Sequence, residues 1–150
     1  MNTSSDKPAS PVSMRRYTFF LRVMGVLYAC LALFFLFFPN EFIYIINAGP
    51  KFLKWTEPLP ELIDKFWLVL SISMLSMLSA LSFLAAESPK IKGYSLVHLL
   101  SKTVSTACYF YFFFGEHHHY FGYLVGIITD ALIALLLVWF LLRNFRSLKI

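Results

Sequence analysis

Residues 121–142 read FGYLVGIITDALIALLLVWFLL, and this stretch contains a single charged side chain, Asp130. A hydrocarbon layer about 30 Å thick needs roughly 20 apolar helical residues to cross it, so the stretch predicts a membrane-spanning helix. Three further apolar stretches, at about 17–38, 63–86 and 95–114, have similar lengths. Backbone groups in lipid must bond within their own segment. The predicted fold class is therefore an all-α membrane protein, a bundle of four transmembrane helices.

The composition leaves little chain for anything else. Of the 150 residues, 59% are hydrophobic and 14% are charged, against roughly 25% charged in an ordinary soluble domain. We expect one transmembrane domain over residues 15–150, preceded by a disordered cytoplasmic tail over the small, polar, proline-containing residues 1–14. Residues 41–55 alternate apolar clusters with polar and proline-containing pieces and are too short to cross. They predict an interfacial segment between helices 1 and 2.

The basic residues predict the orientation of the chain. Most of them flank the first and fourth spans and fill the second loop, as Lys7, Arg15, Arg16, Lys90, Lys92, Arg143, Arg146 and Lys149. Three more, Lys51, Lys54 and Lys65, lie in or beside the first long loop, amid the acidic residues Glu41, Glu57, Glu61 and Asp64. The third connection contains no Lys or Arg. Since cytoplasmic loops carry the excess of basic residues, both termini are expected in the cytoplasm. The net charge of +5 is therefore a topology signal that favours contact with membrane lipids, and no nucleic-acid partner is expected.

Three ionisable residues interrupt the spans: Arg22, Lys102 and Asp130. Such residues cost roughly 2.5–3.5 kcal/mol on insertion scales and usually face a partner or a cavity. At 1.5 Å per residue they lie roughly 8, 10 and 18 Å from the cytoplasmic side. A Lys102–Asp130 pair is feasible, and Arg22 either joins it or extends back to the surface. The pair would either fix the register of the helices or carry protons or ions through Asp130.

The second span carries serines at a three-residue spacing: Ser73, Ser76, Ser79 and Ser82. Such a spacing drifts slowly around a helix, and we expect one narrow stripe. Small residues let membrane helices approach closely and hydrogen-bond across the contact. A hydrophilic pore lining is the alternative, although a stripe without charges suits it poorly. The stripe therefore predicts a helix-packing surface.

The turn before the last span, Glu116, His117, His118 and His119, is rich in metal-binding side chains. Imidazole and carboxylate suit zinc, copper or nickel, but consecutive residues rarely point to one ion. These residues are weak metal candidates, with an exposed polar turn as the alternative. Because His98 lies at the opposite membrane face, haem within one chain is not expected, and no cofactor is predicted.

The sequence contains no Walker loop, no Ser-His-Asp arrangement and no zinc-protease His-Glu-x-x-His. These absences argue against an enzyme, and no catalytic residue is assigned.

Several features resemble the DoxX-like group of small four-span bacterial membrane proteins. They are Arg22-Val23-Met24-Gly25 early in span one, Pro39 just after it, the short polar second loop and Lys102. The amphipathic first loop and the His-rich turn depart from that group. The resemblance implies a bacterial inner membrane location. Some members resemble subunits of membrane oxidoreductase complexes, while many have no assigned activity, and no catalytic residue carries over.

From these observations we expect an accessory or scaffold subunit of a larger inner-membrane complex, with a redox complex as one option. The partner would be a membrane protein or a second copy of the chain. The alternative is a small oligomeric proton-coupled transporter that uses Lys102 and Asp130.

Overall fold

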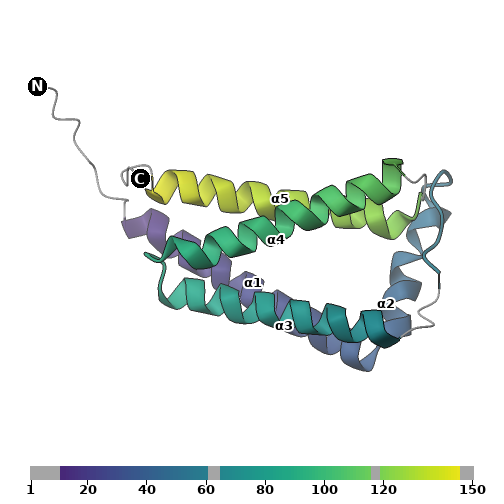
Figure 1. Ribbon diagram of the computed structural model, residues 1–150, viewed down its shortest axis with the longest axis horizontal. Helices are drawn as coiled ribbons and strands as arrows, with labels where there is room; N and C mark the ends of the chain where they lie inside the picture. Colours follow the sequence, from purple (N-terminus) through teal and green to yellow (C-terminus); the bar gives the residue numbers. More distant parts are fainter. Residues whose placement is uncertain (1–10, 61–64, 116–118, 146–150) are drawn as a thin grey trace, which may run out of the picture.

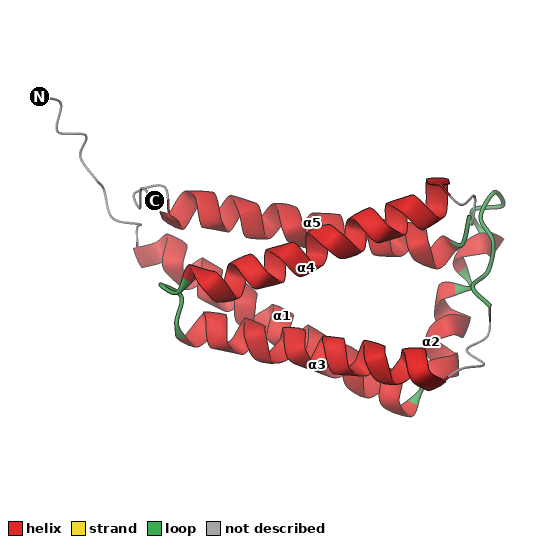
Figure 2. Cartoon of the chain, viewed as in Figure 1, coloured by secondary structure: helices red, strands yellow, loops and turns green. Residues whose placement is uncertain are grey.

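The computed structural model of the chain describes residues 11–60, 65–115 and 119–145, and these are almost entirely helical (Figure 2). The helices are α1 (Pro11–Phe37), α2 (Pro39–Ile46), α3 (Lys65–Glu87), α4 (Lys92–Phe110) and α5 (Phe121–Phe145). A 3₁₀ turn covers Gly49–Lys51, and α4 continues into a π-helical turn at Tyr111–Gly115. Within these described ranges no strand is present. The all-α prediction is confirmed.

Three of the four long helices are long and apolar enough to cross a membrane, namely α1, α3 and α5. This indicates a membrane protein. The helix α4 is of similar length but carries more polar side chains. The first helix begins at Pro11, where proline suits the first helical turn, and so residues 11–14 are helical and not part of the predicted tail. Residues 1–10 lie outside the described part.

The four long helices form two pairs. The helix α1 packs most extensively against α3, and α4 packs most extensively against α5. Figure 1 shows the pairs lying close together near the start of α1 and the end of α5, which we call the terminal end, and diverging toward the opposite end, where α2 lies crosswise. Contacts between the pairs are therefore concentrated in the terminal half of the molecule.

The apolar core lies in this terminal half. Its main cluster consists of Tyr17, Leu21, Ala85, Ala86, Leu137 and Phe140. The two alanines let α1 approach α3 closely, while the Phe140 ring lies 5.5 Å from that of Tyr17. Hydrogen bonds supplement the packing, because Ser13 donates to Asn144 Oδ1 at 2.7 Å and the Tyr17 hydroxyl contacts Ser95 Oγ.

The serine stripe is narrower than the sequence suggested. Ser79 is buried and donates to the Gly25 carbonyl of α1 at 2.8 Å, and Ser82 is fully buried. Ser73 and Ser76 are exposed on the single chain, and Ser76 bonds back to the Ile72 carbonyl of its own helix. A three-residue step turns a helix by about 300°, so three steps carry Ser73 to the side opposite Ser82. The four serines therefore do not form one narrow stripe, and packing through Ser73 and Ser76 stays a prediction.

At the opposite end, the segment between α2 and α3 folds onto the start of α5. The Asn47 side chain donates to the Leu59 carbonyl at 2.9 Å and accepts from the Leu59 amide at 2.7 Å. Glu57 forms a short parallel bridge with Tyr120, in which the Glu57 amide donates to the His119 carbonyl at 2.7 Å. These bonds satisfy backbone groups that would otherwise need water.

Candidate functional site

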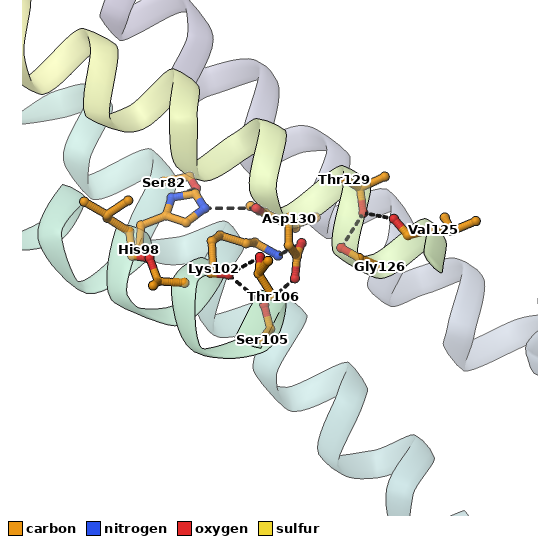
Figure 3. Close-up of polar contacts among 12 residues, drawn as sticks. Ser82, His98, Lys102, Ser105, Thr106, Val125, Gly126, Thr129 and Asp130 are labelled. Carbon is orange, nitrogen blue, oxygen red and sulfur yellow. Dashed lines mark hydrogen bonds and ion pairs between the residues drawn. The ribbon is translucent and has the colours of Figure 1, made fainter. Parts of the chain in front are cut away.

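A buried ion pair lies between α4 and α5. Lys102 Nζ donates to Asp130 Oδ1 at 2.8 Å, and the two side chains are 10% and 12% exposed. The second carboxylate oxygen accepts a hydrogen bond from Ser105, one turn after Lys102 (Figure 3). Lys102 Nζ also lies 5.0 Å from the centre of the Tyr28 ring, within range of a cation–π attraction. Both charges are therefore compensated between the packed helices.

Next to the ion pair lies a second buried polar group, the His98 imidazole, which is 1% exposed. Its Nε2 is 2.9 Å from the Tyr28 hydroxyl, and its Nδ1 is 3.5 Å from Ser82 Oγ. The Ser82 hydroxyl already donates to the Leu78 carbonyl at 2.8 Å. Its oxygen is thus left as an acceptor for a proton on Nδ1, and Nε2 then accepts from the Tyr28 hydroxyl.

Together these side chains form what we call the polar cluster: Tyr28, Ser82, His98, Lys102, Ser105 and Asp130. Each of the four long helices contributes to it, with Tyr28 from α1, Ser82 from α3 and Asp130 from α5. Figure 3 shows His98 and Lys102 on the same side of α4, with Lys102 directed at Asp130. The cluster is a contact point for all four helices.

The structure brings two of the three predicted intramembrane charges together and leaves the third apart. Lys102 and Asp130 pair directly, whereas Arg22 is exposed on α1. Within the described residues Arg22 makes no ion pair.

Of the four metal candidates, only His119 belongs to the described residues. Glu116, His117 and His118 lie outside the described residues, and the His119 ring packs 5.2 Å from that of Phe113. Among the described residues no group of metal-ligating side chains is close enough to hold an ion.

His98, expected at the membrane face opposite the His-rich turn, is buried in the polar cluster. Tyr28 and Ser105 are members of the cluster that the sequence does not predict. One usable signal for His98 was its spacing from Lys102, because residues four apart share a helix face. Tyr28 carries no such signal, since its contact with His98 joins residues 70 positions apart.

The hydrogen bond between Tyr28 and His98 can be tested with Tyr28→Phe. The variant keeps the ring beneath Lys102 and removes only the hydroxyl, so a buried imidazole nitrogen loses its partner. Leaving such a group unsatisfied costs about 1–3 kcal/mol, and the unfolding midpoint should fall in detergent, as followed by circular dichroism. Tyr111→Phe is the matched control, because Tyr111 is 59% exposed. Equal midpoints for the two variants would contradict this role of Tyr28.

Comparisons with protein-family models, curated proteins and solved structures find no match to this chain. The polar cluster and the surfaces of the helices are therefore the features that bear on its function.

Proposed function

We propose that α4 is a fourth membrane span. With its π-helical end it runs from Lys92 to Gly115, roughly 36 Å at 1.5 Å per residue. Its polar side chains Ser95, His98 and Lys102 are buried against the other helices. The surface left for lipid is mostly apolar, because Leu96, Leu100 and Val104 are each about half exposed or more. Thr103 is also exposed, and its hydroxyl donates to the Leu99 carbonyl of the same helix. The most polar residues that lower the hydropathy of α4 thus face the protein interior.

The distribution of charge supports a cytoplasmic terminal end. Arg15 and Arg16 lie near the start of α1, Arg143 lies near the end of α5, and Lys90 lies in the loop between α3 and α4. By the positive-inside rule these residues face the cytoplasm. At the opposite end Tyr44, Ile45 and Phe52 are strongly exposed, as suits a segment lying at the outer membrane interface. We propose a bacterial inner membrane because the sequence features named above resemble those of the DoxX-like group.

The proposed function is that of an accessory or scaffold subunit of a larger inner-membrane complex. The observation that carries it is that the charged groups of the polar cluster find their partners within the cluster. Lys102 and Asp130 are almost fully buried, satisfy one another and receive further contacts from Ser105 and Tyr28. Such an arrangement fixes how four helices meet. The chain then contributes a defined framework with long apolar faces, and the DoxX-like resemblance makes an oxidoreductase complex the first partner to examine.

Purification from the native membrane in mild detergent, followed by mass spectrometry of co-eluting proteins, tests this role. We expect a membrane protein to co-elute in a fixed ratio to this chain. The variant Leu100→Lys introduces a charge on the exposed face of α4 and probes this face of the helix. Recovery of the wild-type chain alone, or only as a homo-oligomer, would contradict the subunit role.

A second candidate is a small oligomeric proton-coupled transporter. One observation favours it: titratable side chains lie next to one another in space, from His98 through Tyr28 to Lys102 and Asp130. Reconstituted vesicles with a trapped pH dye would show proton movement that the Lys102→Met/Asp130→Asn variant abolishes although it still folds. Equal dye signals from this variant, from wild-type protein and from empty vesicles would exclude the transporter function.

A further inference from the structure

A basic stripe runs along the outside of α1 near the terminal end. Arg15 and Arg22 are seven residues apart, so they lie on one side of the helix, with Thr18 and Phe19 between them. These four residues and Met14 line a shallow groove. Both arginines are exposed. Seven residues separate the two Cα atoms by roughly 10 Å along the helix axis. Two long arginine side chains on one face can span this separation and contact a single ligand placed between them.

Arg22 lies within the apolar span Val12–Phe37. A charge in this position is costly in hydrocarbon unless it meets a partner or reaches the headgroup layer. The only carboxylate in the interior of the described bundle, that of Asp130, is paired with Lys102. No described side chain neutralises Arg22, so an anion from outside the bundle would complement the stripe.

An apolar groove of about 590 Å³ adjoins the stripe. It lies between α1 and α5 and is lined by Val12, Arg15, Arg16, Phe19, Phe20, Val23 and Phe140. Arg15 and Phe19 line both grooves, so the basic and apolar surfaces are continuous. The floor is held in place by packing, because the Phe140 ring lies 5.2 Å from that of Phe20, and Asn144 one turn later accepts from Ser13.

We propose that this continuous surface binds one anionic phospholipid. Its phosphate contacts Arg15 and Arg22, and one acyl chain lies along Phe19 and Val23 in the groove against Phe140. Guanidinium groups form paired hydrogen bonds with phosphate oxygens, and basic pockets at the cytoplasmic side of transmembrane helices bind anionic headgroups. A lipid combines the anionic and apolar parts in one molecule, as the surface requires. This inference does not depend on the proposed subunit role.

The test is native mass spectrometry of the purified chain titrated with phosphatidylglycerol or phosphatidylcholine. We expect the wild-type chain to retain phosphatidylglycerol in preference to phosphatidylcholine. The Arg15→Gln/Arg22→Gln variant should bind phosphatidylglycerol about thirtyfold more weakly, as expected when two basic side chains near an anionic headgroup are lost. Arg143→Gln is the matched control, because Arg143 is an exposed arginine at the same end that lines neither groove. Its affinity should stay close to that of wild type.

Two further measurements keep the outcome decisive. The variant Arg15→Lys/Arg22→Lys keeps the charges needed for insertion and should bind with intermediate affinity. Val23→Trp, which fills the apolar groove and leaves the arginines in place, should also weaken binding. Equal losses in Arg143→Gln and in the double glutamine variant would overturn the proposal, since attraction would then be unspecific. Displacement of the lipid by inorganic phosphate alone, or an acidic protein occupying the stripe after purification, would overturn it as well.

Discussion

Replacing Asp130 by asparagine is expected to destabilise the folded protein by about 3–5 kcal/mol, the cost of removing one partner of a buried ion pair. Asparagine keeps the size of the side chain and an oxygen that can accept from Ser105 and Lys102. The expected loss therefore comes from the charge, because the Lys102 ammonium remains buried without its carboxylate. Thermal or denaturant unfolding in detergent micelles would measure this loss.

The double variant Lys102→Met/Asp130→Asn makes the test specific. Removing both charges leaves neither one stranded, so this variant should be more stable than either single variant. Thr129→Val is the matched control, because the exposed Thr129 hydroxyl bonds only within its own helix, to the Val125 and Gly126 carbonyls, and the change should stay within about 0.5 kcal/mol. If both single variants unfold like wild type, the ion pair does not stabilise the folded protein.

The second large effect is expected at Gly126, one turn before Asp130 on α5, where the Tyr109 ring of α4 packs against the helix. A Cβ atom at this position would lie 2.6 Å from the Tyr109 ring, and that ring is stacked 6.0 Å from Tyr123 on α5. Neither the ring nor the helix can yield without loss of packing. Gly126→Ala should therefore destabilise the protein by about 1–3 kcal/mol, as overpacking usually does.

Gly93→Ala provides the matched control for this substitution. Gly93 also lies in a helix, but a Cβ atom there would have no neighbour within 4 Å. Alanine forms helix more readily than glycine, so this variant should be neutral or more stable by up to about 1 kcal/mol. In addition, Tyr109→Leu should relieve part of the loss when combined with Gly126→Ala. Equal unfolding midpoints for Gly93→Ala and Gly126→Ala would show that α4 and α5 are not in close contact at this level.

The sequence by itself determined the helical class and the approximate bounds of the long helices, because apolar runs such as 121–142 leave a chain in lipid few alternatives. It also singled out Lys102 and Asp130, since charges within apolar runs are conspicuous whatever the fold. At the serines of α3, by contrast, the sequence pattern was misleading. Their spacing suggested a common face, but the rotation of the helix over nine residues separates Ser73 from Ser82.

Only the tertiary structure decided what the polar residues meet. Tyr28 and His98 belong to one cluster because folding brings their side chains together from α1 and α4, and Arg22, which has the same charge as Lys102, is exposed on α1. Hydropathy and charge depend on residue type alone, so the sequence is enough to predict which helices are stable in a membrane. Contacts between helices depend on rotation and crossing, which involve residues far apart in the chain, and these are set only when the four helices pack together.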